Sequence, residues 1–109
     1  MTLNEIIKRY DMLSSQEKRR STEDYDERVF YNKDIDEWNK VFTDIFGPPT
    51  KPTGTIPTED DLDLARDYGG IWINQTLFKK ESDNVVVVAM LWPWQDKVHT
   101  TLKTILLKE

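Results

Sequence analysis

The sequence predicts an α+β fold in which N-terminal helices pack on a C-terminal three-stranded antiparallel β-meander. In the first half of the chain, over residues 3–13 and 35–46, apolar residues recur at the three-and-four spacing of a helix face. From Ile71 onward the apolar period approaches two, and Val85–Trp92 is apolar on both of its faces. A strand of this kind needs cover above and below, so it marks the centre of the sheet.

The chain is 109 residues long, which fits one small domain. We expect that domain to comprise a helical part (1–47), a proline-rich connector (48–57), and a short helix followed by the meander (58–109).

The first predicted helix covers residues 3–13. Thr2 and Glu5 form a capping box at its start, and an apolar stripe follows. Residues 14–28 are crowded with charges, and Tyr25 is their one large apolar side chain. We therefore expect that stretch to be exposed, either helical or mobile.

The second predicted helix begins at Asp34, which forms a second box with Glu37, and it carries the broadest apolar stripe of the chain. Gly47 takes the C-cap position. Prolines then recur through residues 48–57, which excludes both helix and central strand. Thr58 or Glu59 caps a short third helix.

Strands are predicted at Ile71–Lys79 and Val85–Trp92, with residues 80–84 as the hairpin loop. The spacing of apolar side chains in residues 98–107 would suit a helix, but half of those residues are β-branched, which favours a third strand. Three helices can cover one face of the meander fully. A second face left uncovered would be an apolar patch and would favour self-association.

Charge and composition narrow the classes of partner. The net charge of −5 disfavours nucleic acid and anionic membranes. The chain has no cysteine, no signal-peptide pattern and no run long enough to cross a bilayer, so we expect a soluble cytoplasmic protein. A protein partner or self-association is consistent with this, and neither nucleic acid nor a membrane is expected.

No catalytic, cofactor or metal signature is present, and no cofactor is expected. Asp96 lies three residues before His99, the only histidine, but no serine or cysteine nucleophile stands beside them in a recognisable motif. The Asp-x-Asp pairs lack the further ligand and the glycine that a calcium loop needs, and the glycines form no phosphate-binding loop.

The tryptophans of the sheet carry the best remaining indication of function. Trp72 and Trp92 are expected in the core, whereas Trp94, in a turn after Pro93, can fold back onto the sheet or project as a contact residue. The candidate interaction surface consists of Trp94, Gln95, Asp96, His99, Met90 and Trp92.

Three functional hypotheses follow. The first is a small acidic protein-interaction or regulatory module without catalytic activity. The second is an enzyme or small-ligand binder that uses Asp96 and His99 beside Trp92 and Trp94. The third is an acidic inhibitor that presents residues 23–27 to a basic nucleic-acid-binding protein. The sequence favours the first and leans away from an enzyme.

Overall fold

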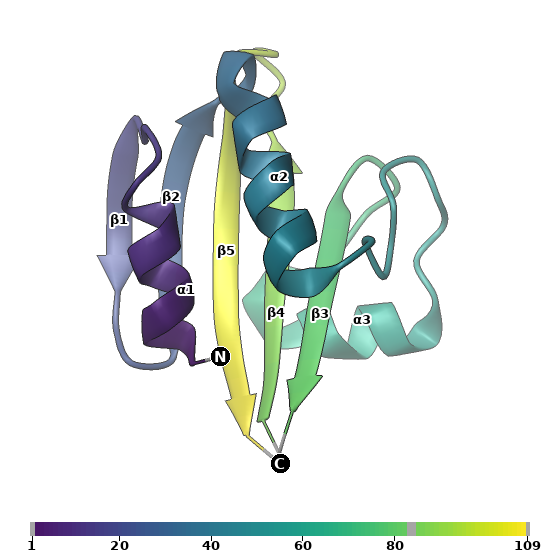
Figure 1. Ribbon diagram of the computed structural model, residues 1–109. Coiled ribbons are helices and arrows are strands. Elements are labelled where there is room, and N and C mark those ends of the chain that lie inside the picture. The colour runs from purple at the N-terminus through teal and green to yellow at the C-terminus, as the bar shows by residue number, and fades with distance from the viewer. Residues whose placement is uncertain (1, 83–84, 109) are drawn as a thin grey trace.

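The sheet that organises the protein has five antiparallel strands in the order β1-β2-β5-β4-β3 (Figure 1). The computed structural model describes residues 2–82 and 85–108. The strands are β1 Glu17–Ser21, β2 Tyr25–Tyr31, β3 Thr76–Ser82, β4 Val85–Pro93 and β5 His99–Lys108. The helices are α1 Leu3–Tyr10, α2 Ile35–Phe46 and α3 Glu59–Ala65, with 3-10 turns η1 Asn32–Asp34 and η2 Arg66–Tyr68.

The predicted α+β class is confirmed, but the three-stranded sheet is wrong. Residues 14–28, expected to be helical or mobile, instead contribute β1 and the first part of β2. The β2 strand pairs with β5, Tyr25 opposite Ile105, so β5 and not β4 lies at the centre of the sheet. Two charged residues of β2, Asp26 and Arg28, are buried and paired with each other. Their mutual neutralisation explains how a strand of charged composition can lie inside the fold.

The β3–β4 hairpin and the strand character of the last segment are confirmed. However, β3 begins at Thr76, not at Ile71, and it continues to Ser82 through part of the expected loop, whose residues 83–84 lie outside the described residues. The predicted start of this strand at Ile71 is wrong because backbone groups of residues 71–75 form hydrogen bonds outside the sheet. Lys51 Nζ takes the carbonyls of Ile73 and Gln75.

Capping explains where most helices begin and end. The Thr2–Glu5 box at α1 is confirmed, and at α3 the cap is Thr58, which forms a box with Asp61. Asp34 does precede α2, but its side chain makes no capping hydrogen bond, so the box predicted there is wrong. Gly47 ends α2 at a φ of 77°, which a residue with a Cβ rarely adopts.

Helices α1 and α2 cover one face of the sheet, in front of it in Figure 1. An aromatic cluster fills the space between them. Trp38 of α2 stacks on Phe30 of β2 with ring centroids 4.9 Å apart, and Tyr10 of α1 meets Trp38 edge-on at 5.5 Å. The Tyr10 hydroxyl also reaches Thr104 Oγ1 at 3.1 Å, so its polar atom is satisfied inside the core.

The opposite face is covered by α3 and η2, which lie behind the sheet in Figure 1. The connector carries the chain round the edge at β3, where Lys51 forms a bridge with Leu77. Val86, Val88 and Met90 of β4 are 9%, 1% and 0% exposed beneath this cover. Within the described residues of β4, these side chains form no apolar patch of the kind that motivated the self-association hypothesis. No helix in the described ranges is long and apolar enough to cross a membrane.

Candidate functional site

The turn after β4 folds back onto the sheet. Pro93 ends the strand, and the amide of Trp94 donates to the His99 carbonyl at 2.9 Å. The Trp94 ring then lies over β5, where its Nε1–H donates to Thr101 Oγ1 at 2.7 Å. Of the two conformations open to Trp94, the structure has the one that covers the sheet.

Trp94 belongs to a row of side chains whose rings contact one another at a tilt of 39°. The Arg19 guanidinium lies 5.4 Å from the Trp94 ring centroid, on one side of the row. The His99 ring lies 4.7 Å from Trp94 and 5.1 Å from Tyr31. This row, together with η2 and α3, completes the cover of the second face.

Asp96 and His99 form a bonded pair within that turn. Asp96 Oδ2 lies 2.6 Å from His99 Nδ1, and Oδ1 accepts from the amides of Val98 and His99 at 2.8 and 3.1 Å. The bond to His99, followed by those to the backbone, lowers the pKa of Asp96. Such a carboxylate fixes the tautomer of an imidazole, as catalytic dyads require.

The partners that would turn this pair into a catalytic or metal site are missing from residues 2–82 and 85–108. There, His99 makes no hydrogen bond to a serine or threonine hydroxyl. The same ranges hold no cluster of three or more His, Asp or Glu side chains placed to bind a metal ion. The pair therefore has a clear structural role, which is to close the β4–β5 turn.

The other members of the predicted surface lie apart. Gln95 is exposed, whereas Met90 is fully buried under α3 and has no access to a partner. Trp92 is partly buried between two neighbours. Lys103 Nζ lies 3.5 Å from its ring centroid, and Gly69, at a φ of 102°, has no Cβ where the ring approaches. The structure thus brings together Trp94, Asp96 and His99 but not Met90.

The acidic stretch of residues 23–27 does not form one surface. Because side chains alternate along a strand, Asp26 points to the face covered by α1 and α2. There both of its oxygens bind Arg28, at 2.7 and 3.0 Å. Glu27 points to the other face and accepts from the Tyr25 hydroxyl at 2.5 Å. A basic partner could not contact the whole run at once.

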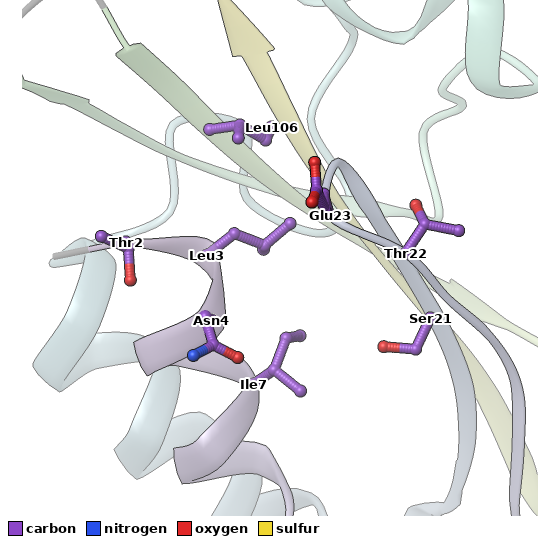
Figure 2. A pocket seen from close by; sticks show the side chains of 8 residues that line it. All are labelled: Thr2, Leu3, Asn4, Ile7, Ser21, Thr22, Glu23 and Leu106. Carbon is purple, nitrogen blue, oxygen red and sulfur yellow. The ribbon is translucent and has the colours of Figure 1, made fainter.

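A cavity of about 490 Å³ opens between α1 and the turn that joins β1 to β2. Figure 2 shows Ile7 on one side and Ser21 on the other, with Leu106 at its edge. Hydroxyl and aliphatic groups dominate the lining, and among the residues that the structure describes Glu23 is its one titratable side chain. A lone exposed carboxylate provides no acid–base pair among the described lining residues.

Sequence reasoning missed several exposed apolar side chains that lie within residues 56–73. Trp72, predicted in the core, is instead 56% exposed, and its neighbour Ile73 is 53% exposed. Ile56 in the connector and Leu62 on α3 are exposed at 78% and 47%. The sequence signal for this region is the break in the two-residue period at Asn74–Gln75, which separates Trp72 from the strand.

The loop that carries Trp72 and Ile73 is held by a buried lysine. Lys51, 1% exposed, donates from Nζ to the carbonyls of Pro52, Ile73 and Gln75 at 3.1, 2.9 and 2.6 Å. The Gln75 side chain accepts from the Trp72 amide at 3.0 Å, and the Gly54 amide donates to Ile73 at 2.7 Å. The connector and the Trp72 loop are therefore fixed to each other.

The same region concentrates the negative charge of the protein. Residues 55–75 contain five carboxylates and one arginine, a net charge of −4 within a chain of −5. Glu59, Asp60 and Asp63 are exposed on α3, whereas Asp61 is 4% exposed and caps the helix through Thr58. Exposed apolar and acidic side chains thus share one segment.

Comparison with known proteins assigns no family. No protein-family model matches the chain, and no curated protein or solved structure matches it significantly. Function is therefore inferred from the side chains of this chain alone.

Proposed function

We propose that the protein is a non-catalytic interaction module that docks a partner protein on the α3 surface. This name denotes the exposed apolar side chains Ile56, Leu62, Trp72 and Ile73 together with the carboxylates Glu59, Asp60 and Asp63. One observation carries the proposal. Of the six large apolar side chains that are strongly exposed in the described residues, four lie in this segment. The proposal is that these side chains form one patch, because contiguous exposed apolar patches are typical of interfaces.

The state of the alternative site supports a non-catalytic role. Asp96 already accepts three hydrogen bonds within its own turn, and Trp94 is committed to Thr101. By contrast, Trp72 is 56% exposed as a residue, and its ring contacts Trp92 edge-on, with centroids 6.0 Å apart, and approaches Gly70. Tryptophan is among the residues that contribute most to binding when a partner buries it.

Charge favours a different protein over a second copy as the occupant. Two copies that met through this surface would bring Glu59, Asp60 and Asp63 of each chain together. Like charges placed face to face across an interface cost several kcal/mol. We therefore expect the protein alone to stay monomeric at about micromolar concentration.

The test compares two exposed apolar side chains. Trp72→Ser removes the proposed anchor, and Met12→Ser, at a site that is 85% exposed and outside the α3 surface, is the matched control. The wild type and Met12→Ser should capture the same proteins from source lysate. Trp72→Ser should capture at least about tenfold less of them. Crosslinks from the captured protein should fall within residues 56–73.

Two results would contradict the proposal. One is a set of captured proteins that Trp72→Ser leaves unchanged. The other is sedimentation showing a dimer of the wild type that Trp72→Ser dissociates, which would make a second copy the occupant. Matching amide NMR spectra of the two variants, outside the mutated sites, would establish that both remain folded.

A further inference from the structure

We propose that a second cavity, between the start of α2 and the sheet, binds an uncharged sugar. Its volume is about 340 Å³, within the range of about 300–1,000 Å³ that is usual for small-molecule sites. None of the described residues that line it belongs to the α3 surface. The proposal therefore goes beyond partner docking and concerns a different part of the molecule.

The floor of this cavity is made by the ends of three adjacent strands. Thr76 of β3 pairs with Leu91 of β4, and Pro93 of β4 pairs with Thr100 of β5. Because side chains alternate along a strand, Leu91 and Pro93 lie on the same face, which is the one covered by α1 and α2. Thr76 and Thr100 are 8% and 4% exposed, so two nearly buried hydroxyls line the cavity.

The walls come from two segments that lie far from these strands in the sequence. Asn32 immediately precedes α2 in η1, Ile35 and Asn39 lie on α2, and Thr53 belongs to the connector. The backbone amide of Asn32 donates to the Val98 carbonyl at 2.8 Å, which holds the start of α2 beside the β4–β5 turn, at the top of Figure 1. The cavity is thus formed by the tertiary fold and not by one loop.

Two side-chain hydrogen bonds order the polar groups of the cavity. Thr100 Oγ1 donates to Asn32 Oδ1 at 2.6 Å, and the hydroxyls of Thr53 and Thr76 are hydrogen-bonded to each other. Asn32 therefore keeps its two amide N–H donors for a ligand, and Thr100 keeps lone pairs that can accept. Groups that are already fixed reduce the ordering cost of binding.

The cavity offers hydrogen bonds but no charge. Every described residue that lines it is uncharged, in a chain of which 32% is charged. Of the charged residues nearby in the sequence, Lys33 lies over the Tyr31 ring, Lys51 donates to three backbone carbonyls, and Asp36 lines a separate hollow that shares Asn39. A phosphate, carboxylate or ammonium group would find no counter-ion among the lining side chains, and burial of an unpaired charge is costly.

A sugar matches the chemistry of this lining. Each sugar hydroxyl can donate one hydrogen bond and accept others, and threonine and asparagine side chains also do both. The Asn39 side chain makes no hydrogen bond to another described residue, so its amide is available. Ile35, Leu91 and Pro93 provide apolar surface for the C–H groups of a sugar ring. A nucleobase fits less well, because the described lining contains no aromatic side chain on which it could stack.

The probes are methyl glucoside, methyl galactoside, methyl mannoside and N-acetylglucosamine, each titrated into the full chain and followed by amide NMR. At least one should bind with a dissociation constant of about 1–10 mM, as expected for so small a ligand. The amides of residues 32, 39, 76 and 100 should shift. Glucuronate, a sugar that carries a carboxylate, is the charged control and should bind at least about tenfold more weakly.

The first pair of variants tests the floor of the cavity. Thr100→Val removes the hydroxyl that bonds Asn32 and keeps the shape of the side chain. Thr101→Val is the matched control, because Thr101 is 7% exposed, lies on the opposite face of β5 and also makes one side-chain bond, to Trp94. We expect sugar affinity to fall about three- to tenfold in Thr100→Val, the effect of one neutral hydrogen bond, and to stay unchanged in Thr101→Val.

The second pair tests the wall. Asn39→Ala removes an amide from the cavity, and Asn4→Ala removes one from the cavity beside α1. Both positions are exposed and helical, and alanine favours a helix, so neither variant should unfold. Sugar affinity should fall in Asn39→Ala alone, again by about three- to tenfold.

Four results would overturn the sugar site. They are the absence of shifts with all four neutral probes, shifts centred on residues outside this cavity, glucuronate binding as tight as that of the neutral probes, and equal loss of affinity in a variant and its control. Uridine is titrated in parallel, and tighter binding of uridine than of every sugar would assign the cavity to a different class of ligand. Because Trp72 and the α3 carboxylates do not line the cavity, none of these results bears on the docking surface.

Discussion

The two faces of the sheet are covered in different ways. Against one face lie two helices, the longer of them with 12 residues, and the side chains they enclose, among them Tyr10, Trp38 and Phe42, are fully buried. Against the other face lie α3, of seven residues, the short turn η2, and the folded-back Trp94.

We propose that this difference separates stability from recognition. The helix-covered face contains a continuous aromatic core, and burial of such side chains dominates folding energetics. The second face encloses a smaller apolar cluster around Val88, Met90 and Ile105. Single polar contacts add to it: those of Lys51, the Thr58–Asp61 cap and the bond from Trp94 to Thr101. Short elements held in this way leave apolar side chains partly exposed, and the proposed docking surface lies among them.

The largest loss of stability is expected from the buried ion pair of Asp26 and Arg28, on the face covered by α1 and α2. Arg28→Met leaves Asp26, which is 0% exposed, with an unpaired charge and should lower the free energy of unfolding by about 3–5 kcal/mol. Urea unfolding measures this loss. The double substitution Arg28→Met with Asp26→Leu should recover most of it, since apolar residues often replace a buried pair without loss. A double variant as unstable as the single one would show that the pair is not the cause.

A smaller and more local loss of stability is expected when Lys51, on the other face, is replaced. Lys51→Met leaves the carbonyls of Ile73 and Gln75 without their buried donor and should cost about 1–3 kcal/mol. Amide exchange in residues 72–76 should accelerate while the core around Trp38 stays protected. Lys40→Met, at an exposed position of α2, is the control and should change neither quantity. If amide exchange around Trp38 accelerated equally, the effect would not be local to one face and this prediction would be wrong.

The smallest effect is expected at the Asp96–His99 turn, as pH falls. The bond to His99 lowers the pKa of Asp96 in the folded state, so its stabilising contribution is present above the unfolded value, about 3.9, and is lost as pH falls through the lower folded value. NMR should show the amides of Val98 and His99 shifting only below about pH 4. In Asp96→Asn this acid shift should vanish, and its persistence would assign the transition to another carboxylate.

Much of the fold follows from residue patterns. The Thr2 cap, the apolar stripe of α2 and the doubly apolar β4 each specify an element locally, and all three are confirmed. The run of charges in residues 14–28 predicts exposure, which holds for β1 but not for Asp26 and Arg28 of β2. The burial of Asp26 depends on Arg28 two residues away and on cover by α1, which no local pattern shows.

The candidate surface was harder to predict than the fold. The closeness of Asp96 and His99 follows from their spacing, but the position of Trp94 depends on Thr101 in the next strand. Trp72 resembled a strand residue in composition. Trp72 lies beyond the ladder because Thr76 already pairs with Leu91 and β4 ends at Pro93. Lys51, more than twenty residues earlier in the chain, binds the neighbouring carbonyl of Ile73.

The central place of β5 has a consequence for how the chain folds. The β3–β4 and β1–β2 hairpins are local and can form early, but they share no edge in the sheet. They are joined only when residues 99–108 insert between them and pair Tyr25 with Ile105. The pairing of β2 with β5 closes the long loop between Tyr31 and His99. Closing so long a loop is slow, because its entropy is lost before the contacts that stabilise it have formed. During synthesis, the edges of β2 and β4 that pair with β5 therefore stay unpaired until residues 99–108 have been made.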